Sequence, residues 1–271
     1  MTNKTKFILF GLFAFFLASC KTDNIQELDQ KQWNLVWSDE FTANQTNGID
    51  TTKWTHDIGR GNNGWGNQEL EYYTDKTENI SLDGKGNLTI TARKENFGGA
   101  SFTSSRIKTQ GKFSTKYGKI EARIKCPYGP GVWPAFWMLG TNVDQVGWPT
   151  CGEIDIMELK GQEPNVIYGS LHGPGYSAGN SITQRYALIN NRFDTDYHTF
   201  SIEWNQEKVD YFVDNYLYQR IERSQTKGNW VFDQEFYLIL NVAIGGTYVG
   251  YVNIDTPFPQ TMYIDYVRVY Q

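Results

Sequence analysis

Short runs of alternating apolar and polar residues recur along this chain and constrain its fold more than any other feature. A period of two places apolar side chains on one face of a β-strand. The alternation is clearest in residues 119–125, 88–93 and 263–270. Residues 236–244 are nearly continuously apolar, which is typical of a strand buried on both faces. No segment has an apolar stripe at helical spacing over three turns.

The connections between these runs favour antiparallel pairing. Asp214-Asn215 lies between two aromatic runs and predicts a β-hairpin turn. The 9 Trp, 17 Tyr and 16 Phe suit pleated surfaces and the 26 Gly suit turns, so composition also favours an all-β protein. We therefore predict one all-β domain over residues 33–271, a sandwich of two antiparallel sheets. The aromatic rings either pack in its core or stack on sugar rings.

The N-terminus predicts export. Lys4 and Lys6 precede an apolar run of 12 residues, 7–18, which is too short to span a bilayer and is typical of a signal peptide. Leu17-Ala18-Ser19-Cys20 resembles a bacterial lipobox, although an ordinary signal peptide with an incidental cysteine is the alternative. We expect residues 1–19 to be removed and Cys20 to be acylated, which anchors a lipoprotein in the outer membrane or at the cell surface. Residues 20–32 are polar and predict a flexible tether.

Charge and cysteine content exclude several classes of function. Removing residues 1–19 takes away two lysines and no acid, so the net charge of −5 becomes −7. An acidic protein gains nothing from phosphate backbones, so we expect no nucleic-acid partner. A neutral polymer suits this charge better than a sulfated one. Cys126 and Cys151 are too few for a disulfide framework, and no CxxC or HExxH spacing predicts a catalytic metal. We expect a monomer.

The most informative segment is Glu153-Ile154-Asp155-Ile156-Met157-Glu158. On a strand, Glu153 and Asp155 share one face. A strict period of two would turn Glu158 to the other face, but one extra residue, a β-bulge, would return it to the acidic face. Three carboxylates on one face repel each other, so stability does not explain them.

Glycoside hydrolysis needs two carboxyl groups on either side of the bond to be broken. A pair ~5–5.5 Å apart gives retention of configuration, and a wider pair gives inversion. On a straight strand the Cα atoms of Glu153 and Glu158 would be roughly 13 Å apart, so converging side chains would be needed for retention. Asp155 between them could hold the protonation state of one glutamate. A calcium site or a solvated acidic edge is the alternative.

The Glu153–Glu158 segment resembles the catalytic signature of glycoside hydrolase family 16 in its bulged E-x-D-x-x-E form. Segments similar to the laminarinase-like branch of the family run from Trp37 to Tyr270. They are Trp65-Gly66-Asn67-Gln68-Glu69-Leu70-Glu71-Tyr72-Tyr73, Trp133-Pro134-Ala135-Phe136-Trp137-Met138, Gly147-Trp148-Pro149, Leu171-His172-Gly173, His198-Thr199-Phe200-Ser201-Ile202-Glu203-Trp204 and Asp265-Tyr266-Val267-Arg268-Val269-Tyr270.

This resemblance implies a β-jelly-roll, concanavalin-like sandwich with a glycan cleft across a concave face. It implies a retaining mechanism with Glu153 as nucleophile, Glu158 as general acid and base, and Asp155 as supporting carboxylate. The implied substrate is laminarin-like β-1,3-glucan, cut internally and without a cofactor. Mixed-linkage glucan, agarose, carrageenan and xyloglucan are alternatives, and so is a non-catalytic surface glycan-binding protein, which would lack one of the two glutamates.

The resemblance also implies residues that support substrate binding. Trp133 and Trp137 share a face if their strand is regular, which Pro134 makes doubtful. The predicted sugar-binding residues are Trp133, Trp137, Trp148, Asn67, Glu69, Arg106 and His172.

Family members often bind a structural calcium far from the cleft, and the matching positions are Glu40, Gly86 and Asp265. One departure from the family lies at residues 245–250, where Tyr248 follows two glycines and relatives often have a tryptophan.

Overall fold

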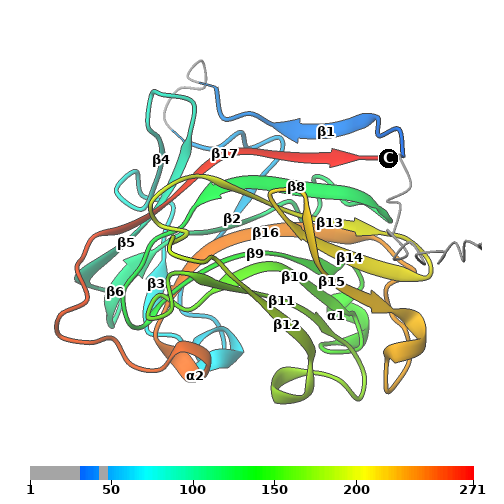
Figure 1. Ribbon diagram of the computed structural model, residues 1–271. Helices are drawn as coiled ribbons and strands as arrows, with labels where there is room; N and C mark the ends of the chain where they lie inside the picture. Colours follow the sequence, from blue (N-terminus) through cyan, green and yellow to red (C-terminus); the bar gives the residue numbers. More distant parts are fainter. Residues whose placement is uncertain (1–30, 43–47) are drawn as a thin grey trace, which may run out of the picture. The chain divides into compact units, whose positions relative to one another are not determined.

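Two stacked β-sheets make up most of the computed structural model, which describes residues 31–42 and 48–271 (Figure 1). The predicted signal peptide, Cys20 and the tether as far as residue 30 lie outside the described residues. The seven-stranded sheet has the order β12-β11-β10-β9-β16-β7-β2. In the ten-stranded sheet β15-β14-β13-β8-β17-β5-β6-β3 form the main path, while β1 pairs with β17 and β4 with β5. The predicted all-β sandwich is confirmed.

The elements have the following bounds. The seven-stranded sheet contains β2 (Thr55–Asp57), β7 (Arg106–Lys108), β9 (Val132–Gly140), β10 (Glu153–Leu159), β11 (Val166–His172), β12 (Ile182–Ala187) and β16 (Phe236–Ile244). The ten-stranded sheet contains β1 (Leu35–Asp39), β3 (Glu71–Tyr73), β4 (Ile80–Leu82), β5 (Leu88–Phe97), β6 (Ala100–Ser104), β8 (Gly118–Lys125), β13 (His198–Trp204), β14 (Lys208–Val213), β15 (Tyr216–Glu222) and β17 (Gln260–Tyr270). The short helices are η1 (Gly64–Gln68), α1 (Val143–Val146), η2 (Ala178–Asn180), η3 (Arg223–Gln225) and α2 (Gly246–Val249).

The predicted strands and hairpin are present. Residues 119–125 fall in β8, 88–93 in β5 and 263–270 in β17. Every residue of β16 is buried, as the continuous apolar run predicts. Asp214 and Asn215 connect β14 to β15 with φ of 49° and 67°. Two successive left-handed residues match the twist of a hairpin, and Asp and Asn adopt that conformation at little steric cost.

The core lies between the two sheets and is built from their inward-facing apolar residues. On the seven-stranded side Phe136 and Met138 of β9 and Leu238 and Leu240 of β16 are completely buried. β9 runs without a register shift against β16 through Pro134, and Pro134 lies beyond the last pair that β9 makes with β10. The missing N–H of the proline therefore leaves this central strand regular, so Trp133 and Trp137 do share a face.

A β-bulge interrupts β10, as the sequence predicts. In the pairing of β10 with β11, Asp155 lies opposite Ser170 and Glu158 lies opposite Tyr168. Between these two pairs β10 has one residue more than β11. The pairing with β9 shifts in the same place. Because of the extra residue, Ile156 and Met157 both join the core, and Glu158 returns to the outer face with Glu153 and Asp155.

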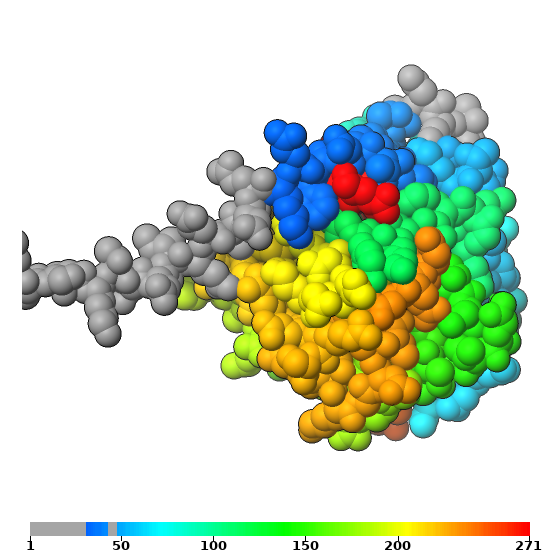
Figure 2. Space-filling view, turned by 90° about the vertical axis from the view of Figure 1, so that its right-hand side faces the viewer, coloured from blue at the N-terminus to red at the C-terminus, as the bar shows by residue number. Residues whose placement is uncertain are grey.

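Residues Trp33–Gln271 form one compact unit. Its first and last segments pair, because the backbone N–H of Gln271 donates to the carbonyl of Asn34 and the reverse bond is also 2.9 Å. Figure 2 shows this end of the unit, with the C-terminus (red) next to the residues of β1 (blue). Both belong to the ten-stranded sheet. Within the described residues, no helix is long and apolar enough to cross a membrane.

Candidate active site

The three acidic side chains of β10 lie together on the outer face of the seven-stranded sheet, with little access to solvent. The side chains of Glu153 and Asp155 are 17% and 6% exposed, and Glu158 is 7% exposed. Such burial of three acids from one strand disfavours the alternative of a solvated acidic edge. It also excludes a purely structural role in the core, since these side chains point away from the inner face.

Each of the two glutamates accepts a hydrogen bond from a tryptophan. Trp148 Nε1 donates to Glu153 Oε2 at 3.1 Å, and Trp133 Nε1 donates to Glu158 Oε1 at 3.1 Å. Trp133 is 9% exposed, whereas Trp148 is 46% exposed. Trp133 therefore offers a sugar little more than its edge, and Trp148 retains an accessible ring. The indole donors fix the orientation of the two carboxyl groups.

Burial raises the pKa of all three groups, and the charge of Asp155 raises the pKa of the two glutamates further. Burial and the charge of Asp155 raise the pKa of Glu153 to about 8, while His172, Arg106 and the Trp148 N–H act in the opposite direction. Burial also raises the pKa of Asp155 to about 8. The pKa of Glu158 is raised well above its ordinary value by burial and then by Asp155. Because only Glu153 has an arginine acting on it, Glu153 ionises more readily than Glu158.

His172 ends β11, directly opposite Glu153 in the strand register. Its Nε2 atom lies 3.0 Å from Asp155 Oδ2 and 3.8 Å from Glu153 Oε1. Its Nδ1 atom accepts a hydrogen bond of 3.1 Å from the backbone N–H of Ala178. The structure thus places His172 beside Glu153, the predicted nucleophile, where the sequence left the role of the histidine open between a sugar contact and an orienting group.

Arg106 of β7 lies between two indole rings. It is on the side of the carboxyl groups where β9, β16 and β7 lie. Its guanidinium carbon lies 4.7 Å from the ring centre of Trp65 and 4.9 Å from that of Trp137. Its Nε is 2.9 Å from Asp57 Oδ2, and Lys108 Nζ is 2.7 Å from Asp57 Oδ1. The rings and the acid position a cation that lowers the pKa of Glu153. The sequence singled out neither Trp65 nor Asp57.

Asn67 and Glu69 are predicted sugar ligands, and the structure shows them bonded to each other and to the sheet. Asn67 Nδ2 donates to Glu69 Oε1 at 3.1 Å, and Tyr73 OH donates to Glu69 Oε2 at 3.1 Å. Glu69 is 5% exposed, so Asn67 is the more accessible of the two side chains. The side-chain amide of Asn241 donates to the Tyr73 oxygen and accepts from Trp137 Nε1 at 2.8 Å. A continuous chain of hydrogen bonds therefore connects the loop to Trp137.

Glu71 is a further buried acid behind this loop. It is completely buried, and its Oε2 accepts the backbone N–H of Ile244 at 2.6 Å. Burial and the neighbouring Glu69 raise its pKa well above the ordinary value. A protonated Glu71 beside Glu69 anchors the loop to the end of β16 without placing two charges in the interior. The sequence did not point to Asn241 or Glu71 as residues of the site. A signal for Asn241 was present, because it is a polar residue within the apolar run 236–244.

Aromatic side chains also surround the Glu158 end of the site. Tyr248 packs on Trp133 with ring centres 4.8 Å apart and on Tyr168 at 6.3 Å. Lys160 Nζ lies 4.4 Å from the ring centre of Tyr248. Tyr248 thus supplies an aromatic ring beside Trp133, within the segment 245–250 where the sequence departs from the resemblance. Gly246, with φ of 88°, lets its helix approach the loop, since a Cβ there would lie 2.7 Å from the Asn67 carbonyl oxygen.

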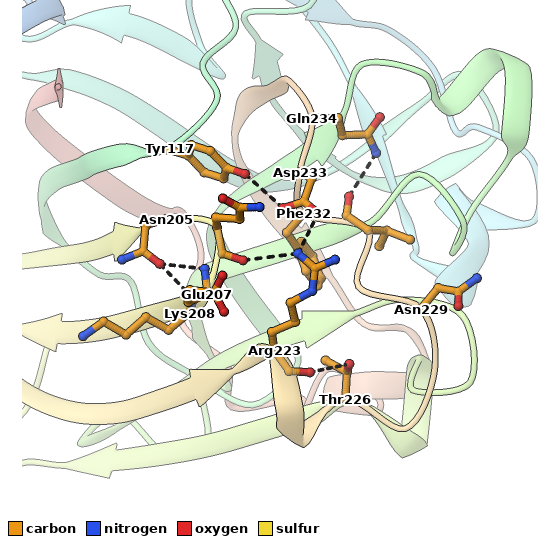
Figure 3. A network of polar contacts seen from close by, with 12 residues as sticks. Tyr117, Asn205, Glu207, Lys208, Arg223, Thr226, Asn229, Phe232, Asp233 and Gln234 are labelled. Carbon is orange, nitrogen blue, oxygen red and sulfur yellow. Dashed lines mark hydrogen bonds and ion pairs between the residues drawn. The ribbon is translucent and has the colours of Figure 1, made fainter.

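The segment before β16 takes part in a network of polar contacts that includes Asp233 and Gln234 (Figure 3). Gln234 Nε2 donates to the carbonyl of Cys151 at 2.7 Å, two residues before Glu153. The neighbouring Asp233 accepts from Tyr117 OH and from Arg223 Nη1, each at 2.9 Å. The Gln234 bond holds the backbone that leads into β10. Cys151 and Cys126 are both buried, free thiols.

The predicted calcium residues do not offer free carboxylates. Glu40 makes a two-bond ion pair with Arg268 at 3.0 and 2.8 Å, and Asp265 pairs with Arg123 at 2.5 Å. A calcium ion normally takes six to eight oxygen ligands, several of them carboxylates. Side chains already neutralised by arginines do not fit that requirement as they stand, so only backbone oxygens, including that of Gly86, remain. The calcium site stays a prediction.

The chain is similar to known proteins along most of its length. The profile of glycosyl hydrolases family 16 matches residues 66–268. A beta-glucanase from Rhodothermus marinus is 40% identical over 289 aligned positions, which cover 100% of this chain and 95% of that protein. The clotting factor G alpha subunit of Tachypleus tridentatus is 42% identical over 89% of this chain, which spans 34% of that subunit.

Solved structures agree. The laminarinase catalytic domain from Thermotoga maritima MSB8 has a TM-score of 0.83 and 50% identity to this chain, over 89% of this chain and 99% of that domain. The family match includes the strand that carries the three acids. The chain therefore belongs to glycosyl hydrolase family 16.

Proposed function

We propose that this protein is a retaining, endo-acting hydrolase of β-1,3-glucan. One observation carries the proposal: Glu153 and Glu158 lie on one face of β10, the Glu153 side chain is only 17% exposed and Glu158 is buried, and each accepts an indole N–H. Two buried carboxyl groups with different electrostatic surroundings are what acid–base glycoside hydrolysis requires. The similarity to a laminarinase supports the choice of polymer.

In the first step, the ionised Glu153 attacks the anomeric carbon of the sugar. The bond from that carbon to the glycosidic oxygen breaks, and Glu158 donates its proton to this oxygen, so the leaving chain departs as an alcohol. In the second step, Glu158, now ionised, takes a proton from water. The water oxygen attacks the same carbon and releases Glu153 as a carboxylate. Two inversions give net retention, and Glu158 regains its proton.

The charge of the site supports a neutral polymer. A sulfated chain would need free cations at the site, and Arg106, the arginine beside the carboxyl groups, is already paired with Asp57. Mixed-linkage glucan is the nearest competitor, and agarose, carrageenan and xyloglucan remain further alternatives. A non-catalytic glycan-binding protein would not need both glutamates, and both are present and buried.

The test uses residues 21–271, which include the whole compact unit. The wild type should release oligosaccharides from laminarin, whereas Glu153→Gln should release none and Glu235→Gln, a change at an exposed acid, should match the wild type. Glu158→Gln should still cleave an activated aryl glycoside, and azide should accelerate that reaction and yield a β-glycosyl azide. Cleavage of another polymer in place of laminarin would overturn the substrate, and an α-azide would overturn the assignment of Glu158.

We also propose that the mature protein is a monomeric lipoprotein, acylated at Cys20, at the outer membrane or cell surface. The compact unit begins beside β1 on the ten-stranded sheet, and the acids lie on the outer face of the other sheet. Metabolic labelling with a palmitate analogue should mark the wild type and spare Cys20→Ser. Labelling of both would refute acylation at this residue.

A structural calcium, if the family pattern holds here, has to rely on backbone oxygens near Glu40 and Gly86. Differential scanning fluorimetry in calcium and in EDTA tests this. A higher melting temperature in calcium that persists in Asp265→Asn supports a backbone site. Equal melting temperatures in both buffers would remove calcium from the description of this protein.

A further inference from the structure

The hydrogen bonds of His172 determine which of its nitrogens carries a proton. A neutral imidazole has one N–H donor and one acceptor nitrogen. Nδ1 accepts the backbone N–H of Ala178 at 3.1 Å, so it cannot carry the proton of the neutral ring. The proton therefore lies on Nε2, the atom that faces Asp155 at 3.0 Å and Glu153 at 3.8 Å.

The carboxylate oxygen nearest to Nε2 has no other partner. Asp155 Oδ2 is buried and makes no hydrogen bond of ordinary geometry within the described part of the chain. A buried carboxylate oxygen without a donor is strongly destabilised. The Nε2–H of His172 is the nearest donor to this oxygen. A small movement of Asp155 or Glu153 would give either acid a hydrogen bond of ordinary geometry with it.

The turn after β11 is built to present the Ala178 amide. Ala178 has φ of 49°, a left-handed conformation that costs a residue with a side chain roughly 1 kcal/mol or more. The turn is closed by mutual backbone hydrogen bonds between Gly173 and Tyr176, both of 3.0 Å. Tyr176 OH donates to the carbonyl of Asn229 at 2.8 Å, which fixes the turn to a neighbouring segment. The strain at Ala178 is thus held by surrounding structure.

We propose that His172 is a positioning residue, locked by the Ala178 amide as an Nε2–H donor that Asp155 and Glu153 share. This inference rests on the proposed function of the two glutamates. A donor directed at these two acids favours their ionised forms over that of Glu158, so that Glu158 is the acid that retains the catalytic proton. The charged groups around the imidazole and these acids are Glu153, Asp155 and Glu158 of β10 and Arg106 of β7.

The same tautomer decides what this group of atoms can bind. Ligand atoms of Glu153, Asp155 and His172 lie within 4.8 Å of one another, close enough to share a metal ion. Coordination through Nε2 would require a free electron pair there and a proton on Nδ1. That proton would meet the Ala178 N–H. The turn therefore favours a hydrogen-bond cluster over a metal site.

The first experiment reads the tautomer directly, by long-range ¹H–¹⁵N NMR of the protein from residue 21 onward. The chain has three histidines, so His172 is assigned by the signal missing from His172→Gln. His198 is an internal reference, because its Nδ1 lies 2.6 Å from Asp214 Oδ2 and must carry a proton. We expect the Nε2–H form for His172 at the pH of maximal activity. An Nδ1–H form or an imidazolium would overturn the proposal, whatever polymer the enzyme cuts.

The second experiment compares two amides at position 172. The side-chain nitrogen of Gln reaches the place of Nε2, and that of Asn the place of Nδ1. Losing a hydrogen bond to a charged group weakens a transition state about 10- to 100-fold, so His172→Asn should lose that much kcat while His172→Gln stays within about tenfold of wild type. KM should change little, and the acidic limb of the His172→Asn pH profile should move to higher pH. Equal kcat for the two variants, with equal pH limbs, would show that the Nε2–H has no such role.

Discussion

Replacing Glu153 by glutamine should make the protein inactive. It should also make the folded protein more stable, but only at neutral and alkaline pH. Burial raises the pKa of this carboxyl from its ordinary 4.5 to about 8. Between these values the unfolded chain has lost its proton while the folded protein keeps it, so wild-type stability falls as pH rises. Glutamine has a similar shape and no charge, and therefore removes the fall.

The magnitude follows from the pKa and the geometry. A rise from 4.5 to about 8 corresponds to about 5 kcal/mol at pH 8 if Glu153 bore it alone. The side chain keeps 17% of its exposure and shares protons with Asp155, and both reduce the figure. We expect a gain of about 1–2 kcal/mol at pH 8, or a melting temperature higher by about 2–8 °C, and no gain at pH 4.

Urea unfolding of wild type and Glu153→Gln at pH 4, 6 and 8 measures this difference, since the midpoint and slope give the free energy of unfolding. Glu235→Gln, at an exposed acid, is the matched control and should show no such pH-dependent gain. A gain for Glu153→Gln that is equal at pH 4 and pH 8, or a loss at pH 8, would refute the reasoning that burial and repulsion destabilise the ionised cluster.

Three further changes test other parts of the site. Trp148→Phe removes an N–H donor from Glu153 but keeps a ring, so kcat/KM should fall by about tenfold and its acidic limb should move to higher pH. Arg106→Lys loses the planar group that fills the space between Trp65 and Trp137, so KM for laminarin oligosaccharides should rise several-fold, measured by product release. Glu71→Gln should keep or raise the melting temperature at pH 8, whereas Glu71→Ala should lower the free energy of unfolding by about 2–4 kcal/mol in urea titrations.

The sheets, the hairpin and the bulge could be predicted because each depends on local pattern. Period-two alternation reports which face of a strand is buried, and Asp214-Asn215 adopts left-handed backbone at little steric cost. The bulge was predicted from one requirement, that the side chain of Glu158 lie on the same face of the strand as that of Glu153. The structure shows how that requirement is met, since Ile156 and Met157 both turn into the core.

The partners of the buried polar groups could not be predicted, because strand pairing joins residues that are far apart in sequence. Asn241 meets Trp137 only because β16 lies beside β9, and Glu71 meets the Ile244 amide across the same region. The link from Ala178 to His172 depends on a backbone N–H, and such a donor leaves no trace in residue identity. Glu69 and Glu71 have the same spacing as Glu153 and Asp155, so acid spacing alone does not separate a support pair from a catalytic pair.

What separates the two acidic pairs is their donors. Glu71 is completely buried and accepts one backbone amide N–H, and burial beside Glu69 raises its pKa, so it holds the loop as a neutral acid. Glu153 has an indole N–H, a nearby arginine and the imidazole of His172, all of which favour its ionised form. Glu158 also has an indole donor and His172 nearby, but burial and its two acidic neighbours raise its pKa well above the ordinary value, so it keeps its proton. A nucleophile and an acid can therefore be told apart on one strand by counting which donors and cations each carboxyl faces, and removing the His172 donor should narrow that difference.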